Sequence, residues 1–496
     1  MNSSKCMNCT CTYVSIVWRC SRARSFVIDL KMISRKRQVL YILFFISAVS
    51  VFYNSNHVFH HSPYNVAPHS LVKSLHLTLE LPRNTTSRRV IVQSYIKHLQ
   101  SQLARRVHQQ YQAGDGEVYR KRRNHVKNAC KKLNRSHNIT AKELRLQTSV
   151  VHSPNLLYCA IPKCGTTFWR RVVVALTRKD PTIRSPFLLS YSDFNVNKAA
   201  FNRTLLKPKN FPALQNLLNN SLKFVFTRNP YHRLFSSYVD KIYAPNNQFW
   251  EVIAKKAALL VRKDNRDPNA TCGQDLTFGE MVRYLNTLSP RKYDEHFLPA
   301  SLKCDVCSVE YDVIGKMETF IKDMSYILNT SDSVGRYLKF HDVTTEYKVD
   351  YIVDAVTRAF LFKKNDNKRW KSWTKCISTH AANQRIWRQL QIAGHIDKTD
   401  PYPLTPQESD VIAMTEYINM ALKAFKRSSK KAKAQKTEAY LQAYSELTRE
   451  DLEILREKYL NDFYLYDYDD RPKDLFEQVG EGKIWDFNYY DLLNVK

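Results

Sequence analysis

Residues 156–173, LLYCAIPKCGTTFWRRVV, constrain the fold of this chain more than any other segment. An apolar run leads into a short loop that contains Lys163 and Gly165, and an amphipathic pattern begins at the paired hydroxyls Thr166 and Thr167. Strand–loop–helix units with a lysine and hydroxyls at the helix start commonly hold phosphate groups. The Walker pattern places its lysine after a second glycine, whereas Lys163 precedes Gly165. The segment therefore predicts a phosphate-binding loop that differs from that of ordinary ATPases.

Beyond about residue 150 the chain alternates between apolar and amphipathic segments. The apolar segments are 155–161, 222–227 and 311–315, and the amphipathic ones include 167–178 and 231–243. Such alternation predicts an α/β fold with a central, mainly parallel sheet flanked by helices. With 496 residues and 44% hydrophobic content, the chain is long enough to bury a large core.

Two later segments have a different character. Residues 363–440 are rich in lysine and include KRSSKKAKAQK, so an exposed insertion is expected there. Near the end, Thr448 and Asp451 form a capping signal that predicts the start of a helix. The apolar face of that helix is expected to consist of Leu452, Leu455 and Tyr459.

Residues 39–53, VLYILFFISAVSVFY, form an uncharged apolar run that follows several basic residues. Its 15 residues fall short of the roughly 20 that usually span a bilayer, and a buried core helix is the alternative. The basic flank favours a type II signal anchor with the N-terminus in the cytosol. The expected organisation is a cytosolic tail (1–38), a transmembrane signal anchor (39–53), a lumenal stem (54–125), a catalytic domain (126–475, with the insertion at 363–440) and a C-terminal tail (476–496).

Seven N-glycosylation sequons lie beyond the apolar run, and this supports a lumenal chain. They begin at Asn84, Asn134, Asn138, Asn202, Asn219, Asn269 and Asn329. Cysteines can oxidise in that compartment. Cys304 and Cys307 form a Cys-x-x-Cys pair, but a zinc site would need a second pair. A structural disulfide is expected, either between these two cysteines or with distant partners such as Cys130 and Cys159.

The formal net charge of +31 predicts a polyanionic partner or substrate. Nucleic acid, acidic lipid and acidic glycan all fit the charge alone. The predicted anchor and the sequons conflict with a nucleic-acid partner and favour an acidic glycan.

A second strand–loop–helix unit occupies residues 222–241, LKFVFTRNPYHRLFSSYVDK. Arg228 leaves the strand, and Pro230 is suited to a first helical turn. The Arg228 guanidinium and the Ser236 hydroxyl could contact one phosphate, because the planar guanidinium fork matches an oxyanion.

Taken together and in this order, residues 161–169 and 228–241 resemble the 5′-phosphosulfate and 3′-phosphate motifs of sulfotransferases. Further blocks resemble those of Golgi carbohydrate sulfotransferases of the HNK-1 and chondroitin 4-O type. These blocks are VKNACKKL (126–133), LTFGEMVRYL (276–285), residues 294–328 and the closing LTREDLEILREKYLNDFYLYDYD (447–469).

This resemblance implies a P-loop-like sulfotransferase fold in the Golgi membrane, with 3′-phosphoadenosine 5′-phosphosulfate as co-substrate and no metal. It also implies a set of residues that bind this sulfate donor. They are Pro162, Lys163, Cys164, Gly165, Thr166, Thr167, Phe168, Arg228, Asn229, Pro230, Arg233 and Ser236.

The resemblance further implies catalytic roles. Lys163 would act at the bridging oxygen of the leaving phosphate, and His296 would be the general base, with Glu295 as a second candidate. His232 is expected to be a solvent-facing helix residue. The implied acceptor is the 4-hydroxyl of N-acetylgalactosamine in chondroitin or dermatan. The alternatives are an HNK-1-type acceptor on another glycoprotein or glycolipid, or a non-catalytic, membrane-anchored glycan-binding protein.

Overall fold

The computed structural model comprises two compact units, Met1–Gln110 and Tyr111–Lys496. The structure describes residues 15–20, 23–29, 116–135, 148–152, 155–178, 183, 185–189, 218–262, 272–330, 338, 342–365, 374–428, 432–479 and 483–494. In the first unit, β1 (Ser15–Cys20) and β2 (Ala23–Asp29) pair in antiparallel fashion. The predicted signal anchor at 39–53 lies outside the described residues. Among the helices that are described, none has the length and apolar character needed to cross a membrane.

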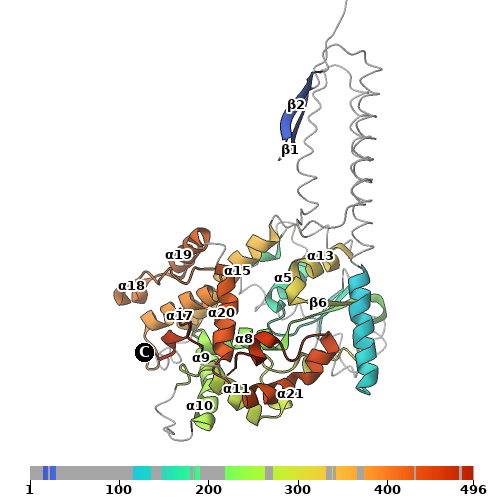
Figure 1. The fold of residues 1–496 in the computed structure, drawn as a ribbon. Helices are drawn as coiled ribbons and strands as arrows, with labels where there is room; N and C mark the ends of the chain where they lie inside the picture. Colours follow the sequence, from blue (N-terminus) through green and yellow to red (C-terminus); the bar gives the residue numbers. More distant parts are fainter. Residues whose placement is uncertain are drawn as a thin grey trace, which may run out of the picture. The chain divides into compact units, whose positions relative to one another are not determined.

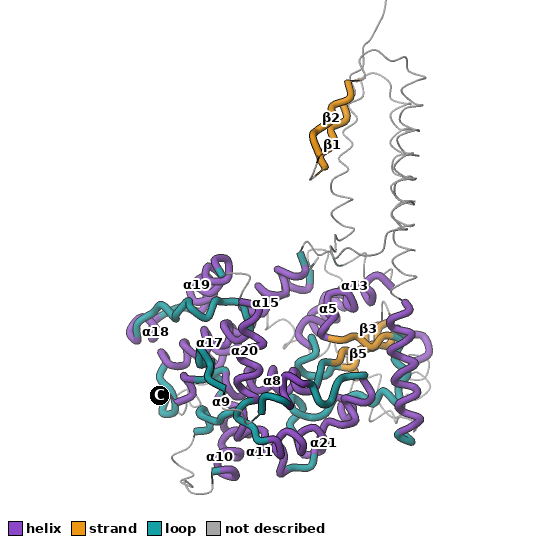
Figure 2. The backbone as a smooth tube through the Cα atoms, viewed as in Figure 1, coloured by secondary structure: helices purple, strands orange, loops and turns teal. Residues whose placement is uncertain are grey.

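The second unit contains a four-stranded sheet in the order β3–β4–β5–β6. Strand β3 (Thr148–His152) pairs antiparallel with β4 (Asn155–Cys159), which runs parallel to β5 (Leu222–Thr227). Strand β6 (Val313–Lys316) is parallel to β5 on its other side. The prediction of a mainly parallel sheet is confirmed for the described strands. Figure 2 shows these strands gathered on one side of a unit that is otherwise mostly helical.

Aromatic side chains pack helices against this sheet. Trp169 of α5 (Thr166–Arg178) lies 4.5 Å from Phe224 and 5.4 Å from Phe226, measured between ring centroids. Phe226 also packs against Phe320 of α13 (Phe320–Thr330), and Figure 1 shows α5 and α13 close to the strands. A Cβ at Gly315 of β6 would come within 2.6 Å of the Phe226 ring, so only glycine fits there.

Helices that follow β5 in sequence build a second core. In α8 (Pro230–Tyr238), Tyr231 packs against Phe463 of α21 (Arg449–Tyr466) with ring centroids 4.8 Å apart. The Tyr444 hydroxyl donates a 2.9 Å hydrogen bond to the Tyr231 carbonyl. Other helices that contribute to this core include α10 (Lys255–Val261), α11 (Phe278–Thr287) and α20 (Ala432–Tyr444).

The capping signal predicted at the start of α21 is confirmed. Thr448 and Asp451 form a reciprocal capping box, in which each side chain accepts a hydrogen bond from the other residue's backbone N–H. The predicted apolar face, Leu452, Leu455 and Tyr459, is buried in the second core.

The structure differs from the exposed insertion expected over 363–440. Trp387 of α17 (Thr379–Ile392) and Tyr417 of α19 (Met414–Arg427) are almost completely buried, and they pack with α15 (Val343–Asn365) in a third core. In α19 the buried residues recur on one face of the helix while its lysines are exposed on the other. The abundance of lysine therefore reflects the outer faces of amphipathic helices rather than a solvated segment.

The ends of the folded unit also extend beyond the limits of 126 and 475 expected for the main domain. Residues 116–132 are helical, and Tyr119 in that helix is fully buried. Near the C-terminus, Tyr489, Tyr490 and Leu493 are buried in the second core. Segments assigned to the stem and to the tail thus contribute to the folded unit.

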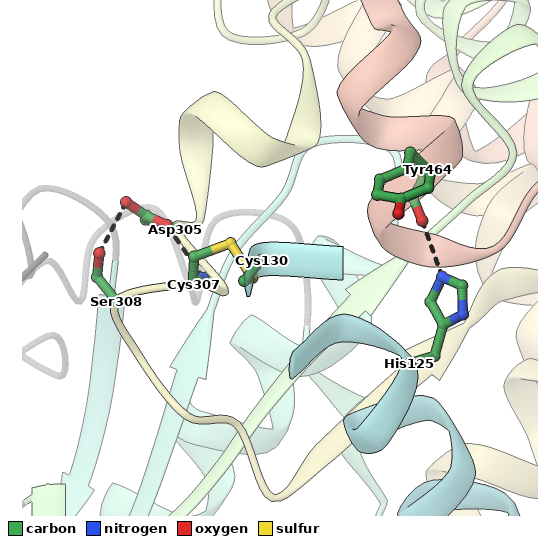
Figure 3. The surroundings of a disulfide bond; sticks show 6 residues. All are labelled: His125, Cys130, Asp305, Cys307, Ser308 and Tyr464. Carbon is green, nitrogen blue, oxygen red and sulfur yellow. Dashed lines mark hydrogen bonds between the residues drawn. A yellow bond between two sulfur atoms is a disulfide. The ribbon is translucent and has the colours of Figure 1, made fainter. Parts of the chain in front are cut away.

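Three disulfides join distant parts of this unit: Cys130–Cys307, Cys159–Cys304 and Cys272–Cys376. The Cys-x-x-Cys pair is therefore bonded to distant partners and not internally. Around the first disulfide, the Asp305 carboxylate accepts hydrogen bonds from the Cys307 N–H and the Ser308 hydroxyl (Figure 3). Each bond closes a loop of more than 100 residues, and such a crosslink typically stabilises by about 5 kcal/mol when it acts alone.

Candidate functional site

The loop between β4 and α5 is a tight turn with an unusual backbone. Lys163 and Gly165 both have positive φ angles, 68° and 75°. The Lys163 conformation is uncommon for a residue with a side chain, and such strain concentrates at functional sites. A Cβ at Gly165 would lie 2.9 Å from the Phe320 ring, so glycine is required by both backbone and packing.

The loop opens onto the N-terminus of α5. The N–H groups of a first helical turn have no partner inside the helix, and together with the helix dipole they favour an anion. Gly165, Thr166 and Thr167 are partly exposed at this point, as is Lys163. These four residues therefore have the setting expected of a phosphate-binding loop.

Three other residues of the predicted loop set have structural surroundings. The Cys164 thiol is fully buried, burial raises its pKa to about 12, and its N–H donates to the Ile161 carbonyl at 3.2 Å. Phe168 is buried edge-on against Phe320, with ring centroids 5.4 Å apart. Pro162 is also buried. The side chains of these residues pack inside the fold and shape the loop.

The second predicted loop lies beside the first because β4 and β5 are adjacent and parallel. The carboxyl ends of such strands meet at one sheet edge, where α/β proteins bind ligands. Asn229 caps α8 by accepting hydrogen bonds from the N–H groups of Tyr231 and His232, and its own N–H donates to Glu318 at 3.0 Å. Asn229 and Pro230 thus set the start of α8 immediately after Arg228.

Arg228 is partly exposed beyond the end of β5. Its positive charge is the main reason why the pKa of Lys436 in α20 falls to about 8. Two neighbouring cations at a sheet edge form a favourable site for an anion. Ser236 is also partly exposed, one helical turn beyond His232 on the same face of α8.

His232 is not the solvent-facing residue that the sequence suggested. Its ring stacks on Tyr440 of α20 with centroids 4.2 Å apart. Burial and the Arg228 cation lower the pKa of His232 to about 3, so the ring is neutral at physiological pH.

Arg233 connects the two loops to the His296 block. Its side chain is 1% exposed, and the guanidinium donates to the carbonyls of Pro162 (3.5 Å), His296 (3.4 Å) and Leu298. Ser237 donates to the same His296 carbonyl at 2.7 Å. Arg233 is among the residues predicted to bind the donor, and in this structure its two terminal guanidinium nitrogens are directed at backbone carbonyls that hold the two segments in place.

His296 forms a dyad with Asp294. Its Nδ1 lies 2.7 Å from an Asp294 carboxylate oxygen, which also accepts the His296 N–H at 2.9 Å. Since a carboxylate only accepts, Nδ1 carries the hydrogen and Nε2 is left as the basic nitrogen. Burial lowers the pKa of His296, and the cations Lys241 and Lys163 add to this against the opposing effect of Asp294. The ring is therefore neutral near pH 7, as a general base must be.

Glu295, the second candidate base, has a different environment. Its carboxylate is about half exposed and pairs with Lys303 at 3.0 Å. Despite some burial, the hydrogen bond and charge of Lys303 lower the pKa of Glu295. An ionised, paired carboxylate of low pKa is a weak base, so the geometry favours His296.

Lys163 belongs to a charge cluster that sequence reasoning missed. Its Nζ lies 2.9 Å from an Asp240 oxygen, and the same carboxylate pairs with Lys241 at 3.3 Å and with Arg358 at 2.8 Å. Asp240 and Lys241 end the second motif, and their adjacency to it was the only available signal. Arg358 comes from α15, and nothing in its local sequence indicated a role.

No metal-binding pattern is evident in the sequence. Within the ranges that are described, no three His, Cys, Asp or Glu side chains gather so that they could hold a metal ion.

The fold and site define an α/β protein in which two loops suited to anionic groups lie beside a lysine and a histidine–aspartate dyad. Residues 146–350 match the model of the Sulfotransferase family. The resemblance seen in the sequence is confirmed for this part of the chain.

The curated relatives are carbohydrate sulfotransferases. Carbohydrate sulfotransferase 11 of Rattus norvegicus is 27% identical over 254 residues, which cover 49% of this chain and 69% of the relative. Carbohydrate sulfotransferase 14 of Danio rerio is 28% identical, with 48% and 65% coverage. Carbohydrate sulfotransferase 9 of Homo sapiens is 28% identical, with 49% and 55% coverage. No solved structure matches the chain significantly.

Proposed function

We propose that this protein transfers the sulfuryl group of 3′-phosphoadenosine 5′-phosphosulfate to a glycan hydroxyl. The observation that carries the proposal is the arrangement at one sheet edge: two loops suited to phosphate groups adjoin a partly buried lysine and a histidine–aspartate dyad. A donor with two separated phosphate groups matches two separated loops. The relatives are carbohydrate sulfotransferases, and this supports a carbohydrate acceptor.

The residues of the site divide into two groups. Lys163, Gly165, Thr166 and Thr167 would hold the 5′-phosphosulfate, and Arg228 and Ser236 the 3′-phosphate. The donor supplies an activated sulfuryl group on a phosphate leaving group. Lys163 would stabilise the charge that develops on that phosphate as the S–O bond to it breaks.

His296 would complete the chemistry on the acceptor side. Its Nε2 would take the proton from the acceptor hydroxyl as the new S–O bond forms, and Asp294 would hold the resulting imidazolium. Positioning the two reactants in line supplies much of the remaining acceleration, as in phosphoryl transfer. Retention of Lys163, Arg228 and Ser236 argues against a protein that only binds glycans.

If Arg228 binds the 3′-phosphate of the donor, an Arg228 variant should lose affinity for nucleotides that carry this phosphate. We expect Arg228→Ala to weaken binding of the product 3′,5′-ADP by about 10- to 100-fold, since a hydrogen bond to a charged group contributes about 1.5–3 kcal/mol. Binding of AMP, which lacks the 3′-phosphate, should change little. Calorimetric titration with both nucleotides measures this difference. Equal losses for both nucleotides, or no loss for either, would place the 3′-phosphate elsewhere.

For the acceptor, we propose the 4-hydroxyl of N-acetylgalactosamine in a chondroitin- or dermatan-like chain. The surplus of positive charge supports a polyanionic acceptor, because it attracts such a chain over a distance set by the ionic strength. An HNK-1-type acceptor on a glycoprotein or glycolipid remains the second candidate. Both belong to the acidic glycans expected from the sequence.

We also propose that the protein is a type II Golgi membrane protein with a lumenal catalytic unit. The three disulfides fit an oxidising compartment. Of the seven sequons, those of Asn134, Asn219 and Asn329 begin at exposed residues of the described structure.

This topology predicts glycosylation of the protein when it is made in animal cells. Enzymatic removal of N-glycans should lower its apparent mass on a gel, because the sequons would have entered the lumen. Protease added to sealed vesicles should leave the part beyond residue 53 intact. An unchanged mass together with complete digestion would contradict the lumenal assignment.

A further inference from the structure

Asp240 lies at the centre of the charge cluster around Lys163. It belongs to a π-helical turn, η5 (Val239–Tyr243), that continues α8, and its side chain is 8% exposed. One carboxylate oxygen faces Lys163 (2.9 Å) and Lys241 (3.3 Å), and the other faces Arg358 (2.8 Å). Single-turn π-helical segments occur frequently at functional sites.

These contacts make an unbalanced group of one anion and three cations. Although burial opposes ionisation, Arg358, Lys163 and Lys241 together hold the pKa of Asp240 well below its usual range. Burial, Arg358 and Lys241 in turn lower the pKa of Lys163 to about 8, against the attraction of Asp240. Lys163 is thus protonated at neutral pH. Burial and the neighbouring cations favour its neutral form, and Asp240 is the group that opposes them. Among the described residues, the other titratable groups that interact with this cluster include the His296–Asp294 dyad, Asp354 and Tyr351.

We propose that Asp240 is the positioning residue of the transfer site, which fixes the Lys163 ammonium in the loop and keeps it charged for the reaction. The ammonium stabilises a developing phosphate charge, whereas a neutral amine cannot. Removing the carboxylate would leave Lys163 beside the cations Lys241 and Arg358 without Asp240 to offset their charge, and the proton of Lys163 would be lost at a lower pH.

Arg358 extends the site beyond the residues that match the family model, which end at 350. It is held there because α15 is anchored to α5, the helix that follows the Lys163 loop. Arg171 of α5 is buried and pairs with Asp354 at 2.7 Å and with Asp350. This anchor places Arg358 opposite Lys163 across the Asp240 carboxylate, so α15 is part of the transfer site.

The inference rests on the proposed function for its meaning, but its test does not need the reaction. The reactivity of Lys163 toward cyanate, followed by peptide mass spectrometry across a range of pH, reports the fraction of neutral amine. In the wild-type full-length chain the midpoint is expected near pH 8. In Asp240→Asn it should move at least about one unit toward acid, since an opposite charge at this distance shifts a pKa by about 1–3 units.

Two further variants keep the test decisive if Asp240→Asn is unstable. Asp240→Glu retains the charge and should keep the midpoint close to that of the wild type. Arg358→Gln removes a competing cation and should move the midpoint in the opposite direction, toward alkaline pH.

A matched control is Asp323→Asn, which removes another buried carboxylate that pairs with an arginine, Arg122, at 2.6 Å. It should lower the melting temperature and leave the Lys163 midpoint in place. An unchanged midpoint in both Asp240→Asn and Arg358→Gln would overturn the role of Asp240. Shifted midpoints in a protein without sulfotransferase activity would uphold this role and refute the proposed function.

Discussion

Replacing Lys163 with alanine is expected to lower kcat for sulfuryl transfer by about 100- to 1000-fold, equivalent to about 3–4 kcal/mol of transition-state stabilisation. The expected loss is large because the ammonium lies at a strained turn beside the N-terminus of α5, where the leaving phosphate would gain negative charge. The measurement is a steady-state rate with saturating donor and acceptor.

Lys223→Ala is a suitable control for this variant. Lys223 is equally buried and also pairs with an aspartate, Asp312, at 3.0 Å, but it lies at the opposite end of β5 from the loops. It should retain a kcat close to that of the wild type. A Lys163→Ala protein that melts normally and turns over at the wild-type rate would show that this loop does not hold the leaving group.

Replacing His296 with alanine should lower kcat by about 100- to 10,000-fold, the range associated with general acid–base groups. Affinity for 3′,5′-ADP should remain, because His296 lies on the acceptor side of the proposed site. The pH dependence adds a second readout. The wild-type rate should fall at acid pH as His296 becomes protonated. This fall should occur at a pH below the ordinary pKa of histidine, because burial lowers the pKa of His296. It should also fall above about pH 8 as Lys163 loses its proton.

In the His296→Ala protein, the pH–rate profile of the residual activity should no longer fall at acid pH, but it should still fall at alkaline pH. Glu295→Gln is the matched control, since Glu295 is adjacent in sequence but pairs with Lys303. It should keep the fall at both acid and alkaline pH and most of the rate. If Glu295→Gln loses activity while His296→Ala does not, the assignment of the base is wrong.

The sequence was sufficient where structure depends on local pattern. The apolar runs predicted β4 and β5, the loop residues predicted the turn at Lys163, and the capping signal predicted α21. In each case the determining residues are contiguous or one helical turn apart. The parallel pairing of β4 and β5 then follows from the strand–helix–strand order, and it brings Lys163 and Arg228 to the same edge.

The parts that the sequence could not supply depend on distant contacts. Asp240 and Arg358 meet only because α15 is anchored to α5 through Arg171, which no local pattern encodes. Arg233 appears in a nucleotide-binding motif, yet its guanidinium is directed at backbone carbonyls. Disulfide partners are likewise a property of the folded chain, so Cys304 and Cys307 could be recognised as a pair but not assigned.

The most direct test of the proposed activity is transfer of radiolabelled sulfate by the purified full-length chain. The donor is labelled 3′-phosphoadenosine 5′-phosphosulfate, and the acceptors are desulfated chondroitin, desulfated dermatan, an HNK-1 precursor glycan and a neutral glycan. We expect label on N-acetylgalactosamine of chondroitin or dermatan, weaker transfer as salt rises, and little transfer by Lys163→Ala. Label on the HNK-1 precursor alone would refute the acceptor and retain the chemistry. A correctly folded protein that binds 3′,5′-ADP but labels none of these glycans would contradict the proposal that it is a carbohydrate sulfotransferase.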